Sequence, residues 1–118
     1  MQRTDRGRWA EDEALSRLQQ RGLVLVERNF RSRYGEIDLI MRDARTLVFV
    51  EVRYRASSRF GSALESVNPQ KQGRLILTAA HYLKQNRLSC ATRFDVAALQ
   101  PGRDGLTLEW IKGAFQAD

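Results

Sequence analysis

The sequence predicts an α/β fold in which a mixed five-stranded sheet is flanked by helices, in the order αβββαββ. Two segments carry apolar residues at helical spacing, and five short segments are rich in β-branched or aromatic residues. Each helix has one apolar stripe to bury and a sheet offers two faces, so a sheet covered by helices is the compact arrangement. At 118 residues the chain fits one domain, which we expect to span residues 1–118 with its core at about 7–115.

The first helix is expected over residues 8–21, because Gly22 favours a left-handed helix end. Its apolar positions are Ala10, Ala14, Leu15 and Leu18. The second helix is expected over residues 69–85, because Asn68 is a favourable N-cap and Pro69 suits the first helical position. Its apolar positions are Leu75, Ile76, Ala79, Ala80 and Leu83. Both helices therefore have one face that can pack on a sheet.

Strands are expected where short runs combine apolar alternation with β-branched and aromatic residues. Such runs lie at residues 23–30, 35–41, 46–55, 93–99 and 106–111. Asp43, Ala44 and Arg45 supply the turn between the second and third runs, and the segment 101–105 supplies the turn between the last two. The second and third runs therefore form a hairpin.

The chain is strongly basic, which favours a polyanionic partner. Twenty Lys and Arg against fourteen Asp and Glu give a net charge of +6, and 17 of these cations are Arg. The planar guanidinium matches phosphate oxygens in pairs, so nucleic acid is the expected partner. Candidate nucleic-acid-binding residues are Arg28, Arg31, Arg33, Arg55 and Arg59. A solvated basic surface is the alternative, and charge alone does not separate nucleic acid from an anionic membrane.

The cysteine content and the absence of long apolar runs indicate where the protein works. Cys90 is the single cysteine, so no internal disulfide framework is possible. The first ten residues are polar and Arg-rich, and no run approaches membrane-spanning length. We therefore expect a cytoplasmic protein without a membrane segment.

The predicted hairpin brings two acids together. Pairing Asp43 with Thr46 across its turn places Asp38 opposite Glu51. Directly opposed residues have β-carbons about 4.5–5.5 Å apart, and like charges at that distance are destabilising unless they are neutralised. Mg²⁺ or Mn²⁺ prefers carboxylate and water oxygens and would neutralise them. An ion held in this way can activate a water and stabilise charge on a phosphodiester.

Two further observations favour a metal site over a row of exposed ion pairs. Glu51 lies in an apolar strand, where an ionised carboxylate is costly unless it is paired or bound to a metal. Glu11 lies close to the apolar stripe of the first helix and is a third candidate acid. The alternative is that each strand acid pairs with a neighbouring Arg and that Glu11 is a first-turn acid favoured by the helix dipole. In the same register Glu36 lies opposite Arg53.

Several short motifs together resemble one known family. They are Gly7-x-x-x-Glu11-x-x-Ala14, Asn29-Phe30-Arg31, Gly35-Glu36-Ile37-Asp38-Leu39-Ile40, Phe49-Val50-Glu51-Val52-Arg53-Tyr54-Arg55, Lys71-x-x-Arg74 and Arg93-Phe94-Asp95-Val96. The combination resembles the YraN family of small bacterial proteins, which is similar to archaeal Holliday-junction resolvases. The resemblance runs from about Gly7 to Phe115. It implies the restriction-endonuclease-like fold and the PD-(D/E)xK nuclease superfamily, with a metal site formed by acids.

The resemblance also implies roles for individual residues. Glu11 matches the helix acid, Asp38 the strand acid, and Glu51 the acid of the acid-x-Lys element, and these three are the implied metal ligands. Glu36 belongs to the Gly-Glu-Ile-Asp motif as a possible accessory residue.

One departure from the superfamily pattern leaves two functions open. Arg53 stands where the superfamily usually has Lys, and Arg stays protonated and cannot act as a base. Lys71 is the candidate for the role of that lysine, with an exposed helix residue as the alternative reading. The implied function is a Mg²⁺- or Mn²⁺-dependent endonuclease that acts on DNA, including branched or structured DNA.

A non-catalytic nucleic-acid-binding or adaptor module that retains the fold is the second hypothesis, and a purely structural partner-binding domain is the third. Resolvases also suggest a homodimer, but nothing in this sequence fixes an interface.

Overall fold

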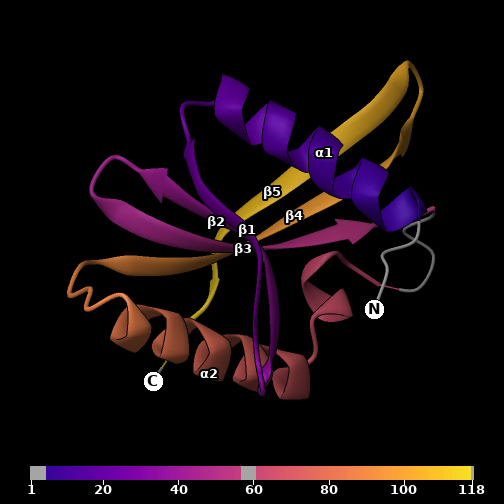
Figure 1. Cartoon of the computed structure of the whole chain (residues 1–118). Helices are drawn as coiled ribbons and strands as arrows, with labels where there is room; N and C mark the ends of the chain where they lie inside the picture. Colours follow the sequence, from indigo (N-terminus) through magenta and orange to yellow (C-terminus); the bar gives the residue numbers. More distant parts are fainter. Residues whose placement is uncertain (1–4, 57–60, 118) are drawn as a thin grey trace.

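The computed structural model describes residues 5–56 and 61–117 of the chain (Figure 1). Its elements are α1 (Asp5–Gln20), β1 (Val24–Ser32), β2 (Gly35–Asp43), β3 (Thr46–Tyr54), η1 (Leu64–Ser66), α2 (Pro69–Gln85), β4 (Thr92–Gly102) and β5 (Gly105–Phe115). The predicted order αβββαββ is confirmed, and the short 3₁₀ helix η1 is added to it. Ser62 and Glu65 start η1 as a reciprocal cap, because each backbone N–H donates to the side chain of the other residue at 3.1 and 3.2 Å.

All five strands form one sheet in the order β1-β2-β3-β4-β5. β3 and β4 run parallel, and the other neighbouring strands run antiparallel, so the predicted mixed sheet is confirmed. A parallel pair needs a crossover connection, and α2 lies within the connection between β3 and β4. The two helices cover opposite faces of the sheet (Figure 1). β3 is therefore the central strand of a three-layer molecule.

Each face of the sheet has its own apolar layer. Under α2 the buried side chains are Phe30, Ile37, Ile40, Leu47, Phe49, Val67, Leu75, Ala79, Tyr82, Phe94 and Val96. Under α1 they are Ala10, Ala14, Leu18, Leu23, Leu39, Met41, Val48, Val50, Ala97 and Leu99. Burying a side chain such as Leu or Ile contributes about 1.5–3 kcal/mol, so these layers fix both helices on the sheet. Within residues 5–56 and 61–117, no helix combines the length and the apolar composition needed to cross a bilayer.

Strand β2 is irregular at the point where the predicted acids lie. Strict alternation would place residues 37, 39 and 41 on one face. Instead Ile37 packs under α2, whereas Leu39 and Met41 pack under α1. The pairing of β2 with β3 extends from Asp43 at the turn to Leu39, which pairs with Val50. The chain that precedes Leu39 therefore leaves β3 and opens the sheet between the two helices.

The start of α2 is fixed by local signals. The Asn68 side chain accepts a hydrogen bond from the Lys71 N–H at 2.8 Å, and Pro69 occupies the first helical position. The last hairpin is longer than expected, because Pro101 and Gly102 still pair with β5. β4 has already passed the end of β3 there, so the missing N–H of Pro101 interrupts no hydrogen bond to that neighbour.

Candidate metal centre

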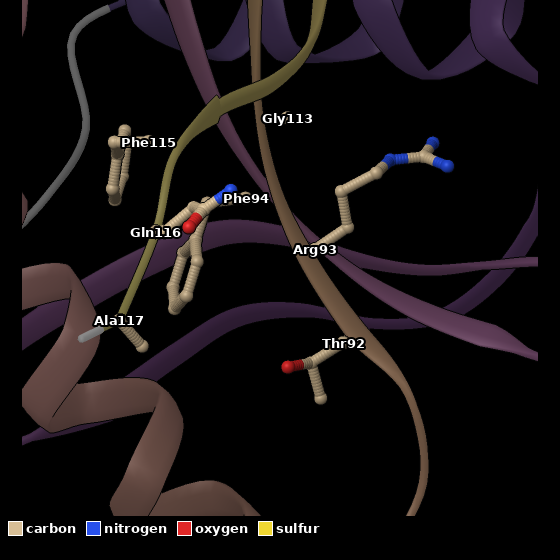
Figure 2. Close-up of a pocket in the computed structure, with 7 residues that line it drawn as sticks. All are labelled: Thr92, Arg93, Phe94, Gly113, Phe115, Gln116 and Ala117. Carbon is tan, nitrogen blue, oxygen red and sulfur yellow. The ribbon is translucent and has the colours of Figure 1, made fainter.

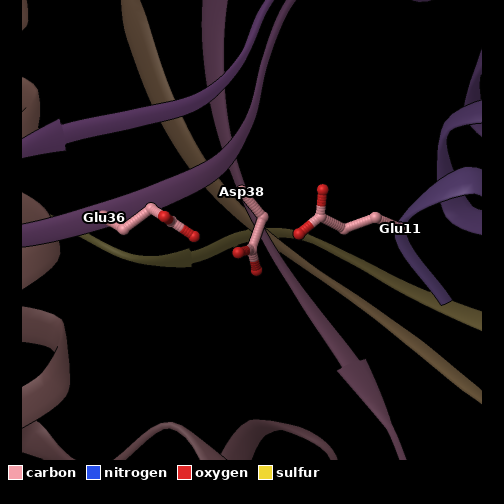
Figure 3. A group of neighbouring side chains, drawn as sticks. All are labelled: Glu11, Glu36 and Asp38. Atoms are coloured by element: carbon pink, nitrogen blue, oxygen red, sulfur yellow. The ribbon is translucent and has the colours of Figure 1, made fainter. Parts of the chain in front are cut away.

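Three carboxylates from α1 and β2 converge beside the opening in the sheet. One oxygen each from Glu11, Glu36 and Asp38 lies within 4.8 Å of the other two. Figure 3 shows Asp38 between the other two side chains, with Glu11 reaching it from the helix and Glu36 from the same strand. Glu11 is buried, with 2% of its surface exposed. Three oxygen donors at this spacing form a site that suits Mg²⁺ or Mn²⁺.

Glu11 is held in place by groups on β1. Asn29 Nδ2 donates to Glu11 Oε1 at 2.9 Å, and Arg28 Nη2 lies 3.4 Å from the same oxygen. Arg28 also bonds Asp12 at 2.7 Å. Asn29 has a φ of 54°, a left-handed conformation that Asn adopts more readily than most residues. The backbone conformation of β1 at Asn29 thus directs the side-chain amide of Asn29 toward Glu11.

The Asp38 side chain accepts a hydrogen bond from a backbone N–H of the neighbouring strand. Its Oδ2 accepts from the Val52 N–H at 2.8 Å, just beyond the last paired residues of β2 and β3. Burial raises the pKa of the Asp38 carboxyl well above its usual value, and the negative charge of Glu51 raises it further. The hydrogen bond from Val52 acts in the opposite direction. A bound cation would stabilise the charged form that burial and Glu51 disfavour.

Glu51 forms a second part of the site, on the central strand. It is 5% exposed, and its Oε2 lies 2.9 Å from Lys71 Nζ and 3.4 Å from Arg53 Nη2. Glu51 and Asp38 line the same pocket. The predicted acids Glu11, Asp38 and Glu51 therefore gather at one place, with Glu36 in the three-oxygen group and Glu51 paired to cations beside it.

A pocket of about 220 Å³ opens this site to solvent. Its lining residues are Gly35, Glu36, Asp38, Glu51, Lys71, Arg74 and Leu75. The acids come from β2 and β3, whereas Lys71 and Arg74 come from the first turns of α2. A phosphate that entered the pocket would meet carboxylates on one wall and cations on the other.

Arg53 and Lys71 differ in their surroundings. Arg53 Nη2 donates to the Ser66 carbonyl at 3.1 Å, which ties β3 to η1. Lys71 lines the pocket and approaches Glu51 more closely than Arg53 does. The structure thus places a lysine at the strand acid from a different element, as the sequence analysis suggested.

The predicted hairpin register is confirmed between Asp43 and Leu39, but the pairing of β2 with β3 ends at Leu39 and Val50 and does not include the predicted pair of Asp38 and Glu51. The expected pairing of Glu36 with Arg53 is wrong. Glu36 instead pairs with Arg31 of β1, and Arg31 Nε lies 2.5 Å from Glu36 Oε2. The reason is the departure of β2 from β3, which leaves β1 as the partner of residue 36.

The five predicted nucleic-acid-binding arginines do not share one environment. Arg28 contacts Glu11 and Arg31 contacts Glu36, two of the three clustered acids. Arg33 is exposed and lies over the Tyr34 ring, with 5.0 Å from its Cζ to the ring centroid. Arg55 donates to the Gly61 carbonyl. Arg59 lies outside the described residues.

Sequence reasoning missed three residues that shape the centre. Asn29 positions Glu11, Arg74 lines the pocket, and Gly35 fits the turn against α2. A Cβ on Gly35 would lie 3.6 Å from Thr78 Oγ1, and its φ of 153° is one that side chains rarely adopt. Arg74 follows Lys71 by one helical turn, so their shared face was a usable signal.

A second pocket, of about 360 Å³, lies away from these acids, between the start of β4 and the end of β5 (Figure 2). Its neighbour Asp95 is fully buried and accepts hydrogen bonds from Arg93, the Trp110 indole and the Gly113 N–H at 2.9 to 3.0 Å. Asp95 therefore forms a structural ion pair with Arg93. Arg93 also bonds Asp43, so this network ties β4 to the β2–β3 turn and to β5.

Comparison with known proteins identifies close relatives. The model of the family described as Uncharacterised protein family UPF0102 matches residues 10–99. A UPF0102 protein of Methylococcus capsulatus is 50% identical over 111 residues, which cover 94% of this chain and 90% of that protein. A UPF0102 protein of Dechloromonas aromatica is 53% identical over 115 residues, covering 98% of this chain and 92% of that protein.

Proposed function

This chain belongs to the UPF0102 family, and from that premise we propose that it is a divalent-metal-dependent endonuclease that hydrolyses phosphodiester bonds in DNA. The observation that carries the proposal is the convergence of Glu11, Glu36 and Asp38 within 4.8 Å, beside a lysine-paired acid in a solvent-open pocket. The restriction-endonuclease-like fold implied by the sequence motifs agrees with this arrangement of acids on a mixed sheet.

The donor set fits Mg²⁺ or Mn²⁺. Glu11, Glu36 and Asp38 would hold the ion through carboxylate oxygens, which hard divalent cations prefer. The raised pKa of Asp38 supports this assignment, since burial beside Glu51 disfavours its negative charge. When bound, such an ion supplies charge neutralisation at the phosphate and an activated water.

Lys71 and Arg74 would contact the substrate from α2. Lys71 Nζ is near enough to Glu51 to be oriented by it, and its ammonium group can donate hydrogen bonds to a phosphate oxygen. Arg74 is exposed at the rim of the same pocket and can bind a neighbouring phosphate. Arg53, tied to Ser66 and Glu51, holds the strand acid in place.

DNA is the proposed partner because the net charge is +6 and the acidic pocket is flanked by cations. Such a protein would bind DNA with an affinity that falls steeply as salt increases. Structured forms such as junctions and flaps are included in the proposal, since the fold alone does not choose a substrate.

The test combines metal binding with cleavage. Purified protein is titrated with Mn²⁺ by calorimetry and then incubated with junction, flap, single-stranded and duplex DNA. We expect one Mn²⁺ site that is lost in Asp38→Asn, and cleavage that is lost in the Asp38→Asn, Glu51→Gln double variant. Equal product from the wild-type protein and the double variant on all four substrates would overturn the proposal.

A further inference from the structure

A third pocket, of about 270 Å³, lies between the β1–β2 turn and the outer face of α2. Its lining residues are Arg33, Tyr34, Leu77, Ala80, His81 and Lys84. None of these described lining residues is acidic. The pocket combines an aromatic and aliphatic interior with cations, a composition different from that of the metal centre.

The turn that forms one wall is anchored to the helix. The Tyr34 N–H donates to Ser32 Oγ at 3.0 Å, and Ser32 Oγ donates to Thr78 Oγ1 at 3.3 Å. A Cβ added to Gly35 would lie in van der Waals contact with Thr78 and Arg74. In Figure 1 the tip of the β1–β2 hairpin lies beside α2. The pocket is therefore built from two elements that partly buried hydrogen bonds hold together.

The chemistry of the wall suits an aromatic ring that carries a nearby negative charge. Arg33 lies over the Tyr34 ring and donates to its hydroxyl at 2.8 Å, which orients the ring. Leu77 is 49% exposed and adds an apolar side chain to the wall of the pocket. Bases of single-stranded nucleic acid stack on aromatic side chains while Arg and Lys follow the phosphates. Arg33 and Lys84 are placed for that second role.

This pocket and the acidic pocket are lined by neighbouring parts of the β1–β2 hairpin and of α2. Gly35 lines the acidic pocket and the adjacent Tyr34 lines this one. On α2, Arg74 lines the acidic pocket and His81 lines this one, and a rise of 1.5 Å per residue separates them by about 10 Å. A stacked strand advances about 3.4 Å per nucleotide, so this distance corresponds to about three nucleotides.

We propose that the Tyr34–His81 pocket binds an unpaired nucleobase about three nucleotides from the phosphate at the acidic cluster. The inference rests on the proposed function and restricts its substrate class, because the preferred DNA is then single-stranded next to the bond that is cleaved. A paired base is not available to the pocket unless it first leaves the duplex, at a cost of a few kcal/mol. Flaps and unpaired arms of branched DNA satisfy this requirement, whereas a continuous duplex does not.

The test measures binding without cleavage. Wild-type protein in EDTA is titrated, at fixed salt, into fluorescein-labelled single strands of thymidine or uridine and a duplex, each about 12 nucleotides long. We expect tighter binding of single strands than of duplex. Tyr34→Ala should weaken single-strand binding about tenfold, and Tyr34→Phe should restore most of it, because a phenyl ring still stacks. Tighter binding of the uridine strand would support the pocket assignment and would identify RNA as the preferred single strand.

Matched charge variants complete the test. Arg33→Ala should weaken binding, whereas Arg103→Ala, which removes one exposed charge from the β4–β5 turn, should have a much smaller effect. Equal affinity for duplex and single strand, or equal binding by the Tyr34→Ala and Tyr34→Phe variants, would overturn the inference. Tyr34-dependent single-strand binding without any Mn²⁺-dependent cleavage would overturn the proposed function alone. Cleavage with no Tyr34 dependence of binding would overturn this inference alone.

Discussion

Lys71 Nζ lies 2.9 Å from Glu51 Oε2, so an ammonium group on α2 meets the buried acid of the central strand. In the nuclease superfamily that the sequence motifs resemble, the lysine usually lies on the same strand as its acid, two residues further on. Here that position holds Arg53, which is bound to the Ser66 carbonyl. The α2 lysine and the strand acid therefore form the pair that the proposed reaction needs.

Lys71→Ala should reduce the single-turnover cleavage rate about 100-fold, because one positioned donor at a developing charge is typically worth that much. Calorimetry should show a much smaller change in Mn²⁺ affinity, since Lys71 is not among the three clustered acids. Lys112→Ala is the control, because Lys112 lies over the Trp110 ring on β5. Cleavage by Lys71→Ala at the wild-type rate would show that Lys71 has no role in the reaction.

Arg53→Lys should not rescue Lys71→Ala. Arg53 spans the distance from β3 to η1, and a shorter lysine at this position loses the hydrogen bond to Ser66. Cleavage by the double variant at or above the wild-type rate would show that the strand position is the catalytic one.

Asp38→Asn should make the metal-free protein more stable at neutral pH. The pKa of Asp38 is higher in the folded state than in the unfolded state. As the pH rises from the unfolded pKa to the folded pKa, the free energy of unfolding therefore falls, and above the folded pKa the loss is complete. The neutral amide of the variant would avoid this loss while its oxygen still accepts from the Val52 N–H. Urea unfolding in EDTA should show the gain at neutral pH and none at about pH 3, below the ordinary Asp pKa of about 3.9.

Saturating Mn²⁺ should reverse that order, because the ion stabilises the wild-type folded state and not the variant. An equal loss of stability in the variant at both pH values, with or without Mn²⁺, would contradict the assignment of Asp38.

Asn29→Gly should lower Mn²⁺ affinity about tenfold with little change in stability. Glycine tolerates the left-handed backbone but removes the amide that holds Glu11, and groups that orient metal ligands commonly contribute about 10- to 100-fold. Asn29→Ala should lose about 1 kcal/mol more of unfolding free energy, since alanine is strained at this φ. Calorimetry and urea unfolding of the two variants separate these effects.

Asp95→Asn should lower the free energy of unfolding by about 3 kcal/mol, because both buried carboxylate oxygens accept from N–H donors and the amide NH₂ of the variant would leave such donors unsatisfied. Mn²⁺ affinity of the folded variant should stay unchanged, which separates Asp95 from the metal centre. Glu109→Gln, an exposed change on β5, should alter stability by no more than about 0.5 kcal/mol. Loss of metal binding by folded Asp95→Asn would show that the two networks are coupled.

Local patterns carried enough information to predict the elements and two strand acids. The cap at Asn68 and Pro69 predicted the start of α2, and the turn after Asp43 predicted the register of β2 on β3 as far as Leu39. These features depend on neighbouring residues and on periodicity, which the sequence displays directly.

Tertiary geometry accounts for the features that were missed. Strict alternation could not predict the irregularity of β2 at Asp38. Because of this irregularity, Glu36 pairs with β1 and its side chain joins the acidic cluster. Likewise the pocket between Tyr34 and His81 joins a turn to a helix that follows much later in the chain. Propensity and spacing say nothing about how a hairpin tip docks on a helix.

The crossover that makes β3 and β4 neighbours has a consequence for the order of folding. Strands β1, β2 and β3 follow one another through short turns, so their pairing is local in sequence. The pairing of β3 with β4 is less local, because α2 lies between these two strands in the sequence. Glu11 and Lys71 arrive with the two helices, from opposite faces. The proposed metal centre would thus be assembled late, and in a refolding experiment Mn²⁺ binding should lag behind the recovery of the β-sheet signal.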